Sequence, residues 1–285
     1  MRTQPFGATG VAVPLIGQGT WQLPPDEAGE RRALEALEAG LARGMIHLDT
    51  AEMYGRGRAE ELVGRLLKGR SRDELFVVSK VLPSNASREG TRRACERSLR
   101  RLGTDHLDAY LLHWRGNTYP LDETIRALED LVTAGKTRAV GVSNFDVADL
   151  QEAQRALGRE RLACNQVLYH LGDRAVENEL LPYCQAEGIA LVAYSPFGSG
   201  HFPDERSPGG ALLARIAEAH GRSARQVALR FLLRSPNVFV IPKAARRDHA
   251  EENAAALDFD LGDDDIAAID RAFPAPPAGT PLGSL

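Results

Sequence analysis

The feature that most constrains the fold of this chain is a regular alternation of short apolar segments with longer amphipathic ones. Short runs rich in β-branched and aliphatic residues predict buried strands. These predicted strands cover residues 15–20, 45–49, 75–81, 107–113, 139–143, 163–167, 189–195 and 238–242. Between them, helical periodicity predicts helices over residues 27–43, 59–68, 87–102, 121–134, 147–157, 174–187 and 224–234. Several of these segments begin at Ser or Asp and end at Gly, as helices commonly do.

Eight strands that each precede a helix predict an α/β fold of the (β/α)8 barrel type, a TIM barrel, which needs about 250 residues. A doubly wound sheet shows the same alternation, but it usually has fewer strands. Before the first strand, residues 5–14 predict a small β-hairpin that caps the bottom of the barrel. After the last strand, two extra helices are expected at 246–257 and 263–273, and the Pro/Gly-rich residues 274–285 are expected to form a flexible tail. We therefore expect a single domain over residues 1–285.

Composition excludes several classes of partner. The net charge is −4 with both signs interspersed, so no basic surface for nucleic acid and no polybasic membrane anchor is expected. Cys95, Cys164 and Cys184 are an odd number without C-x-x-C spacing, which argues against a disulfide framework and a zinc site. The chain also carries no signal-peptide pattern and no apolar run of membrane-spanning length. We expect a cytoplasmic protein with a small-molecule partner.

Four polar residues stand at or just after the ends of three successive predicted strands: Asp49, Tyr54, Lys80 and His113. In a (β/α)8 barrel the carboxyl ends of the strands converge on one mouth, where active sites lie. A carboxylate, a phenol, an ammonium and an imidazole brought together there predict a proton-transfer site. By themselves, Asp49 and Lys80 are also compatible with an ion pair that only joins two strands.

A metal-dependent hydrolase is the first competing function, since His47-x-Asp49 together with His113 offers possible ligands. The sixth and eighth predicted strands end in Asn-Gln and Pro-Lys, which leaves too few imidazoles and carboxylates for a metal cage. We therefore expect no bound metal.

Eight short motifs occur in order along the chain, and together they resemble the aldo-keto reductase family. They are GTW at 19–21, LDTAEMYG at 48–55, SK at 79–80, LLHW at 111–114, GVSNF at 141–145, NQ at 165–166, AYSPFGSG at 193–200 and IPKA at 241–244. The resemblance covers almost the whole chain and is greatest to bacterial reductases of small aldehydes and 2-oxoaldehydes. It implies a monomeric enzyme that uses NADPH to reduce carbonyl compounds, such as methylglyoxal and aromatic aldehydes, to alcohols.

The resemblance also implies a role for each of the four polar residues. Tyr54 is the general acid that protonates the carbonyl oxygen, and the Lys80 ammonium stabilises the phenolate that this leaves. Asp49 holds Lys80, and neutral His113 donates a hydrogen bond to the substrate carbonyl. Trp21 and Trp114 are expected to wall the substrate pocket, with Met53 as a weaker candidate.

For the cofactor, the resemblance places Ser143, Asn144 and Gln166 on the nicotinamide carboxamide and Tyr194 against the nicotinamide ring. Residues 195–199 are expected at the pyrophosphate, and Lys243 at the adenosine 2′-phosphate. The remaining expected cofactor contacts are Gly19, Thr20, Asp49, Ser195, Pro196, Phe197, Ser199, Ile241, Pro242, Ala244, His249, Glu252 and Asn253.

At the 2′-phosphate the chain departs from the family pattern. Ala244 and His249 stand where family members often have Ser or Thr and Arg, and Arg246 and Arg247 are expected to compensate electrostatically. NADPH is therefore expected to be preferred over NADH. A second competing function is a cofactor-sensing regulatory subunit, because some family members serve as such while they keep all four polar residues.

Overall fold

Eight parallel strands form a closed barrel in the computed structural model, which describes residues 1–24 and 26–285. Neighbouring strands follow the order β10-β9-β8-β7-β6-β5-β4-β3. A parallel bridge between Ile16 and Val240 closes the ring, with the Gly17 N–H donating to the Val240 carbonyl at 2.8 Å. The predicted barrel is confirmed. The strands are β3 (Gln18–Gly19), β4 (His47–Asp49), β5 (Phe76–Val81), β6 (Ala109–Leu112), β7 (Val140–Ser143), β8 (Leu162–Leu168), β9 (Ala190–Tyr194) and β10 (Val238–Val240).

The predicted N-terminal hairpin is also confirmed. Strands β1 (Thr3–Pro5) and β2 (Ala12–Pro14) pair antiparallel, and the 3-10 turn η1 (Gly7–Thr9) lies between them. The hairpin places Phe6 inside the barrel, where its ring centroid lies 4.7 Å from that of Phe76 and 5.0 Å from that of Phe239. The hairpin therefore closes one end of the barrel with an aromatic plug.

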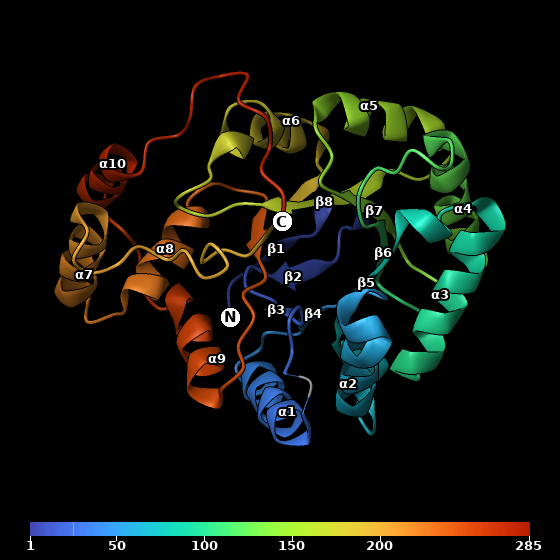
Figure 1. Cartoon of the computed structure of the whole chain (residues 1–285), viewed down its shortest axis with the longest axis horizontal. Coiled ribbons are helices and arrows are strands. Elements are labelled where there is room, and N and C mark those ends of the chain that lie inside the picture. Colours follow the sequence, from blue (N-terminus) through green and yellow to red (C-terminus); the bar gives the residue numbers. More distant parts are fainter. Residues whose placement is uncertain (25) are drawn as a thin grey trace.

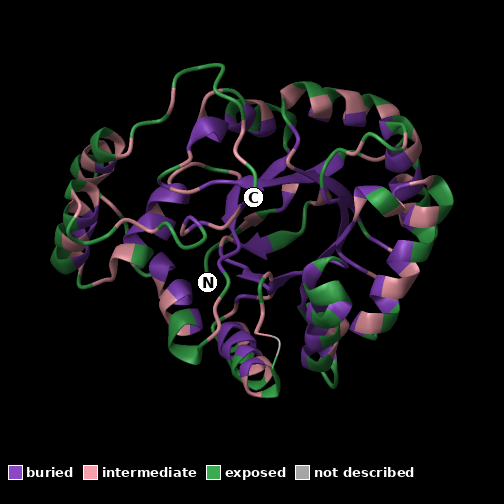
Figure 2. Ribbon diagram, in the orientation of Figure 1, coloured by how far each residue is buried: buried purple, intermediate pink, exposed green. Residues whose placement is uncertain are grey.

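Helices surround the barrel and turn their buried faces toward the strands (Figures 1 and 2). Asp26, Ser87 and Asp146 cap three of them, each accepting a hydrogen bond from a backbone N–H in the first turn. No helix in the described part of the chain is long and apolar enough to cross a membrane. The ring consists of α1 (Glu27–Ala42), α2 (Arg58–Leu67), α3 (Arg88–Leu102), α4 (Leu121–Thr133), α5 (Val147–Ala156), α6 (Leu180–Glu187), α8 (Ala224–Leu232) and α9 (Arg247–Ala254).

One predicted helix, over residues 174–187, starts later than expected. Residues Ala175–Glu177 form the 3-10 turn η5, and α6 begins only at Leu180. The reason is Pro182, which has no N–H to donate and is tolerated in the first turn of a helix but not in its interior. A helix that began at residue 174 would have placed Pro182 in its interior.

A helix that the apolar pattern did not predict, α7 (Pro208–His220), precedes α8. Its first turn contains Gly209 and Gly210, whose poor helix propensity hides it in the sequence. Both glycines are needed, because a Cβ on Gly210 would lie 1.9 Å from the Asp204 carbonyl oxygen and one on Gly209 would lie 2.6 Å from the Phe273 ring.

Both helices expected after the last strand, at 246–257 and 263–273, are present. The segment 246–257 contains α9, followed by the 3-10 turn η6 (Ala255–Leu257), and α9 packs against α1 as a member of the ring. The helices outside the ring are α7 and α10 (Asp263–Ala272), which contact each other on one side of the molecule (Figure 1).

The tail, residues 274–285, runs from α10 back across the molecule, and the C-terminal residue lies over the middle of the barrel (Figure 1). Two carbonyls of the tail, those of Pro276 and Pro277, accept hydrogen bonds from the Asn178 side chain at 3.1 Å. Flexibility of this segment stays a prediction. The position of the tail nevertheless brings Leu285 to the functional site.

Candidate active site

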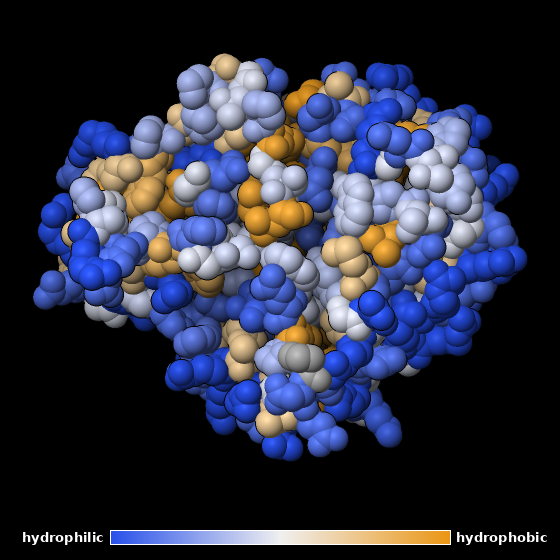
Figure 3. Space-filling model, viewed as in Figure 1, coloured by the Kyte–Doolittle hydropathy of each residue, from blue (hydrophilic) through white to orange (hydrophobic). Residues whose placement is uncertain are grey.

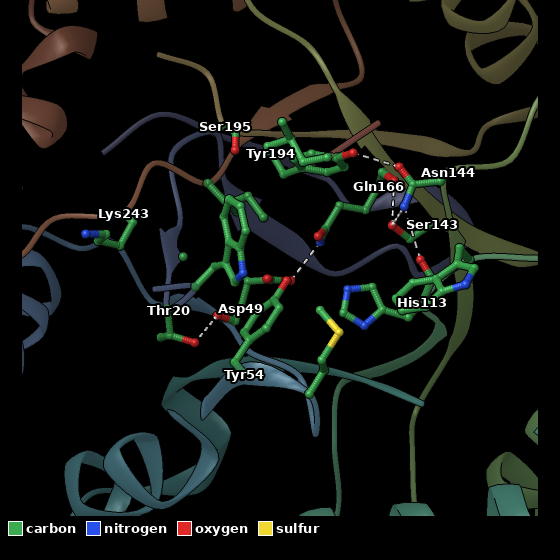
Figure 4. Close-up of a pocket in the computed structure, with 16 residues that line it drawn as sticks. Thr20, Asp49, Tyr54, His113, Ser143, Asn144, Gln166, Tyr194, Ser195 and Lys243 are labelled. Atoms are coloured by element: carbon green, nitrogen blue, oxygen red, sulfur yellow. Dashed lines mark hydrogen bonds between the residues drawn. The ribbon is translucent and has the colours of Figure 1, made fainter. Parts of the chain in front are cut away.

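A pocket of about 120 Å³ opens at the carboxyl ends of the strands. Charged residues lie around the perimeter of this face of the molecule, and apolar ones gather toward its middle (Figure 3). Figure 4 shows polar side chains from several strands pointing into the pocket. The lining residues are Gly19, Thr20, Trp21, Asp49, Met53, Tyr54, His113, Trp114, Ser143, Asn144, Gln166, Tyr194, Ser195, Ile241, Lys243 and Leu285.

Lys80 lies at the centre of the predicted proton-transfer group and is completely buried. Its Nζ donates to Asp49 Oδ1 at 2.7 Å, to the Thr50 carbonyl at 2.9 Å and to the Tyr54 hydroxyl at 3.3 Å. The His113 ring centroid lies 5.6 Å from that of Tyr54, with the two rings nearly perpendicular. The structure therefore brings together all four residues that the strand-end pattern selected.

The turn that carries Tyr54 is held to the neighbouring strand end. Tyr54 begins the 3-10 turn η2 (Tyr54–Gly57), in which Gly55 and Arg56 both have φ of 57°. Just before it, the Glu52 carboxylate accepts hydrogen bonds from the Leu82 N–H at 2.8 Å and the Asn85 side chain at 2.9 Å. These bonds fix the Tyr54 turn relative to the segment that follows Lys80.

Electrostatics in the pocket favour a neutral imidazole beside a protonated phenol. Burial, together with the nearby Lys80 charge, lowers the pKa of His113 to about 3. Burial also raises the pKa of Tyr54 above 10, and the Lys80 charge opposes this rise without overcoming it. Burial lowers the pKa of Lys80 too, but Asp49 and Tyr54 outweigh it, so the net shift of that pKa is upward. The predicted neutral His113 thus has a physical basis, and Lys80 stays charged.

A second polar group lies on the other side of the pocket, at the ends of β7 and β9. Asn144 has a left-handed φ of 61°, which turns its side chain across the mouth. Its amide Nδ2 donates to the His113 carbonyl and to Ser143 Oγ, both at 3.1 Å, and its Oδ1 accepts from the Tyr194 hydroxyl at 2.8 Å. The amide and hydroxyl groups expected at a nicotinamide carboxamide are therefore side by side.

Gln166 on β8 makes a contact that the strand-end pattern did not predict. Its amide Nε2 donates to Asp49 Oδ2 at 2.7 Å (Figure 4). One Asp49 carboxylate therefore joins Gln166 to Lys80. No sequence signal marks this bond, because its partners are 117 residues apart.

The loop after β9 has an irregular backbone. Ser195, Gly198, Ser199 and Gly200 all have positive φ. Phe197 anchors this loop: its ring lies edge-on to Phe202, and both rings face the Arg225 guanidinium. The role of this segment at the pyrophosphate stays a prediction.

The predicted 2′-phosphate side is open and far less organised. Lys243 is exposed and lines the edge of the pocket. Arg246 is paired with Asp248, and Arg247 with Glu251, whose carboxylate accepts from Arg247 Nε at 2.9 Å. The two arginines are thus engaged by neighbours on their own helix, which weakens the compensation expected from them.

Several other expected cofactor contacts do not line the pocket itself. Ala244 packs partly buried on the core, His249 is exposed and Asn253 is buried on α9. Two residues near these in the sequence, Pro242 and Glu252, do not line the pocket either. Nor do Pro196, Phe197 and Ser199 in the loop after β9.

The substrate side of the pocket has aromatic walls, as expected. Trp21 packs against Tyr54, and the Trp114 ring lies 4.9 Å from the His113 ring with 38% of the residue exposed. Met53 also lines the pocket and is equally exposed. The residue that sequence reasoning missed is Leu285, because nothing in a Pro/Gly-rich tail indicates where it lies.

The described residues contain no group of three or more His, Cys, Asp or Glu side chains placed to hold a metal ion. The structure therefore gives no support to the metal-dependent hydrolase.

With the geometry established, comparison with known proteins gives a consistent result. Residues 15–273 match the sequence profile of the Aldo/keto reductase family. The chain is 44% identical over 272 residues to methylglyoxal reductase YeaE of Escherichia coli, covering 95% of each protein. It is 40% identical over 263 residues to glyoxal reductase of Bacillus subtilis, covering 92% of this chain and 89% of that protein.

Solved structures agree. An aldo-keto reductase from Klebsiella pneumoniae in complex with NADPH superposes with a TM-score of 0.92 at 44% identity, and the match covers 100% of this chain and 99% of that one. A second structure, an aldo/keto reductase from Klebsiella pneumoniae with NADP and acetate, gives a TM-score of 0.91 at 42% identity with full coverage of both chains.

Proposed function

The chain belongs to the aldo-keto reductase family, and on this premise we propose that it reduces small aldehydes and 2-oxoaldehydes to alcohols with NADPH. The observation that carries this proposal is the contact between the Lys80 ammonium and the Tyr54 hydroxyl on the pocket floor, with neutral His113 beside them. Relatives named for methylglyoxal and glyoxal reduction support the substrate class.

Tyr54 is the proton donor in this proposal. Its hydroxyl transfers a proton to the carbonyl oxygen as negative charge develops there, and Lys80 Nζ, at 3.3 Å, stabilises the phenolate that remains. The raised pKa of Tyr54 keeps the phenol protonated at neutral pH, so the donor is loaded before substrate arrives. Asp49 keeps the buried ammonium charged and aligned.

His113 orients the substrate. Because its pKa is about 3, the imidazole is neutral, and a ring N–H donates a hydrogen bond to the carbonyl without giving up its proton. Such a donor stabilises the charge that appears on the oxygen in the transition state. Trp21 and Trp114 line the same pocket of about 120 Å³, a volume that suits a small substrate.

The residues of the mouth fit a nicotinamide cofactor. When bound, this cofactor would supply a hydride to the carbonyl carbon. Ser143, Asn144 and Gln166 offer hydrogen-bonding groups to its carboxamide, and Tyr194 offers a ring face. We assign residues 195–199 to the pyrophosphate, and Lys243, exposed at the edge of the pocket, to a 2′-phosphate.

The test is the loss of reduced-nicotinamide absorbance with purified protein, NADPH and a panel of methylglyoxal, glyoxal and benzaldehyde. We expect turnover with all three, with the corresponding alcohols identified by mass spectrometry. Tight NADPH binding without turnover of any carbonyl compound would contradict the proposal and favour the cofactor-sensing subunit.

A further inference from the structure

The bond between Gln166 and Asp49 crosses the barrel. In the ring, β8 and β4 are separated by β5, β6 and β7 on one side and by β9, β10 and β3 on the other, so the two strands are opposite each other. Backbone pairing therefore does not join Gln166 to Asp49 directly. Their side chains do so across the barrel, through the 2.7 Å bond, and both residues are at most 2% exposed.

Hydrogen bonding determines which end of the Gln166 amide faces Asp49. A carboxylate only accepts, so the NH₂ group must point to Asp49 Oδ2 and the amide oxygen must point elsewhere. The backbone of Gln166 is held as well, since its carbonyl accepts from Ser143 Oγ at 2.8 Å and from the Asn144 N–H at 2.9 Å. The backbone of Gln166 is thus held on β8 by residues at the end of β7, while its side chain extends across the barrel to Asp49.

Gln166 completes the hydrogen bonding of the Asp49 carboxylate. Oδ1 accepts from Lys80, and Oδ2 accepts from Gln166. A charged oxygen that is buried without a donor is costly, so the loss of the Gln166 amide would drive Asp49 to turn both oxygens toward Lys80. Of the three bonds that Lys80 Nζ makes, the 3.3 Å bond to Tyr54 is the longest, and it is the one that such a movement would break.

We propose that Gln166 is a positioning residue for the proton donor: through Asp49 it keeps the Lys80 ammonium against the Tyr54 hydroxyl. This role is additional to the carboxamide contact, and it rests on the proposed function of Tyr54. Because the NH₂ end of the amide contacts Asp49 and the opposite end is available to the cofactor, one side chain links cofactor recognition to the proton donor.

Few charged or titratable groups face Tyr54, which makes its titration a clean readout. They are Lys80 on β5, Asp49 on β4, His113 after β6 and the Tyr194 hydroxyl on β9. With Gln166→Met, Lys80 moves away and the Asp49 charge is less well compensated. Both changes disfavour the phenolate, so the Tyr54 pKa should rise.

The experiment compares Gln166→Met, a variant of similar length without hydrogen-bonding groups, with Lys243→Ala. Lys243 is also expected to contact the cofactor, but it is exposed and is not among the hydrogen-bond partners of Asp49 or Gln166. Tyr54 is followed without cofactor by NMR of ¹³Cζ-labelled tyrosine at increasing pH, and its signal is assigned with Tyr54→Phe. We expect the Tyr54 pKa to rise by about one unit in Gln166→Met and to stay unchanged in Lys243→Ala.

Kinetics at saturating NADPH give a second readout at neutral pH. In Gln166→Met we expect kcat to fall about tenfold and the solvent deuterium isotope effect on kcat to rise, because proton transfer becomes harder. Lys243→Ala should weaken NADPH binding and leave that isotope effect unchanged. An unchanged Tyr54 pKa and solvent isotope effect in Gln166→Met would overturn the inference. The proposed function fails separately, if Tyr54→Phe retains full activity.

Discussion

The two ends of the proposed cofactor and substrate site are built in opposite ways. At the catalytic end, Asp49 and Lys80 are buried, both Asp49 oxygens accept hydrogen bonds, and each bond crosses from one strand to another. At the phosphate end, Lys243 is exposed, and Arg246 and Arg247 are paired with acidic residues on α9 itself.

Because of this difference, substitutions at the two ends should have different consequences. A buried, fully hydrogen-bonded group tolerates little change, since the loss of one partner leaves a charge without compensation. An exposed cation contributes to binding independently of its neighbours, and salt screens that contribution. We therefore expect substitutions at the catalytic end to abolish most turnover. Substitutions at the phosphate end should change the preference for NADPH by small steps.

The largest expected effect comes from removing the proton donor. Tyr54→Phe should lower kcat about 10²- to 10⁴-fold, because a ring without its hydroxyl cannot protonate the carbonyl oxygen. NADPH affinity, measured by cofactor fluorescence, should be nearly unchanged. Tyr183→Phe, on the outer helix α6, is the matched control and should behave as wild type. A Tyr54→Phe enzyme within about threefold of wild-type activity would contradict the assignment.

The next largest effect is expected on stability. Urea unfolding of two lysine-to-methionine variants compares the buried Lys80 with the exposed Lys243. Lys80→Met leaves the Asp49 charge buried without its cation and should lower the free energy of unfolding by about 3–5 kcal/mol. Lys243→Met, at an exposed site, should change it by less than about 0.5 kcal/mol. Equal losses in the two variants would show that the two ends do not differ as described.

Much of this contrast could be predicted from the sequence, and the reasons are physical. Strand periodicity and the rule that barrel chemistry lies at strand ends were enough to select Asp49, Lys80 and His113, because strand order converts directly into adjacency. Tyr54 follows within a few residues of Asp49, so its position is also largely local.

What could not be predicted depends on contacts between distant segments. The Gln166–Asp49 bond crosses the barrel. Leu285 lines the pocket at the end of a tail whose Pro276 and Pro277 carbonyls accept hydrogen bonds from Asn178. Helix α7 was missed because Gly209 and Gly210 have poor helix propensity, whereas the close packing at these two positions is visible only in the folded chain.

A third prediction concerns pH and the barrel interior. His47 is wholly buried, and burial lowers its pKa from 6.5 to about 4. A histidine whose pKa is lower in the folded protein stabilises it fully above about pH 6.5, and this contribution is lost as the pH falls through 4. We expect up to about 3 kcal/mol less stability near pH 4 from this group.

The measurement is the free energy of unfolding between pH 7.5 and pH 4. His47→Leu should reduce the slope of stability with pH relative to wild type. An identical slope in His47→Leu and wild type would contradict the prediction.

The smallest expected effect is at the phosphate end. Lys243→Ala should raise the KM for NADPH about tenfold, the value of one charge-assisted contact, and leave the KM for NADH unchanged. Arg247→Ala should have less effect, because Glu251 already engages that guanidinium. Parallel changes for both cofactors would mean that Lys243 does not face the 2′-phosphate.

If Tyr54 and Lys80 act as one proton-donating unit, their substitutions should not have additive effects on kcat, which a double-mutant cycle measures. We expect Tyr54→Phe combined with Lys80→Met to be no slower than the slower single variant, since the ammonium has no phenolate left to stabilise. Losses that multiply in the double variant would contradict this expectation, because they would mean that the two residues contribute independently.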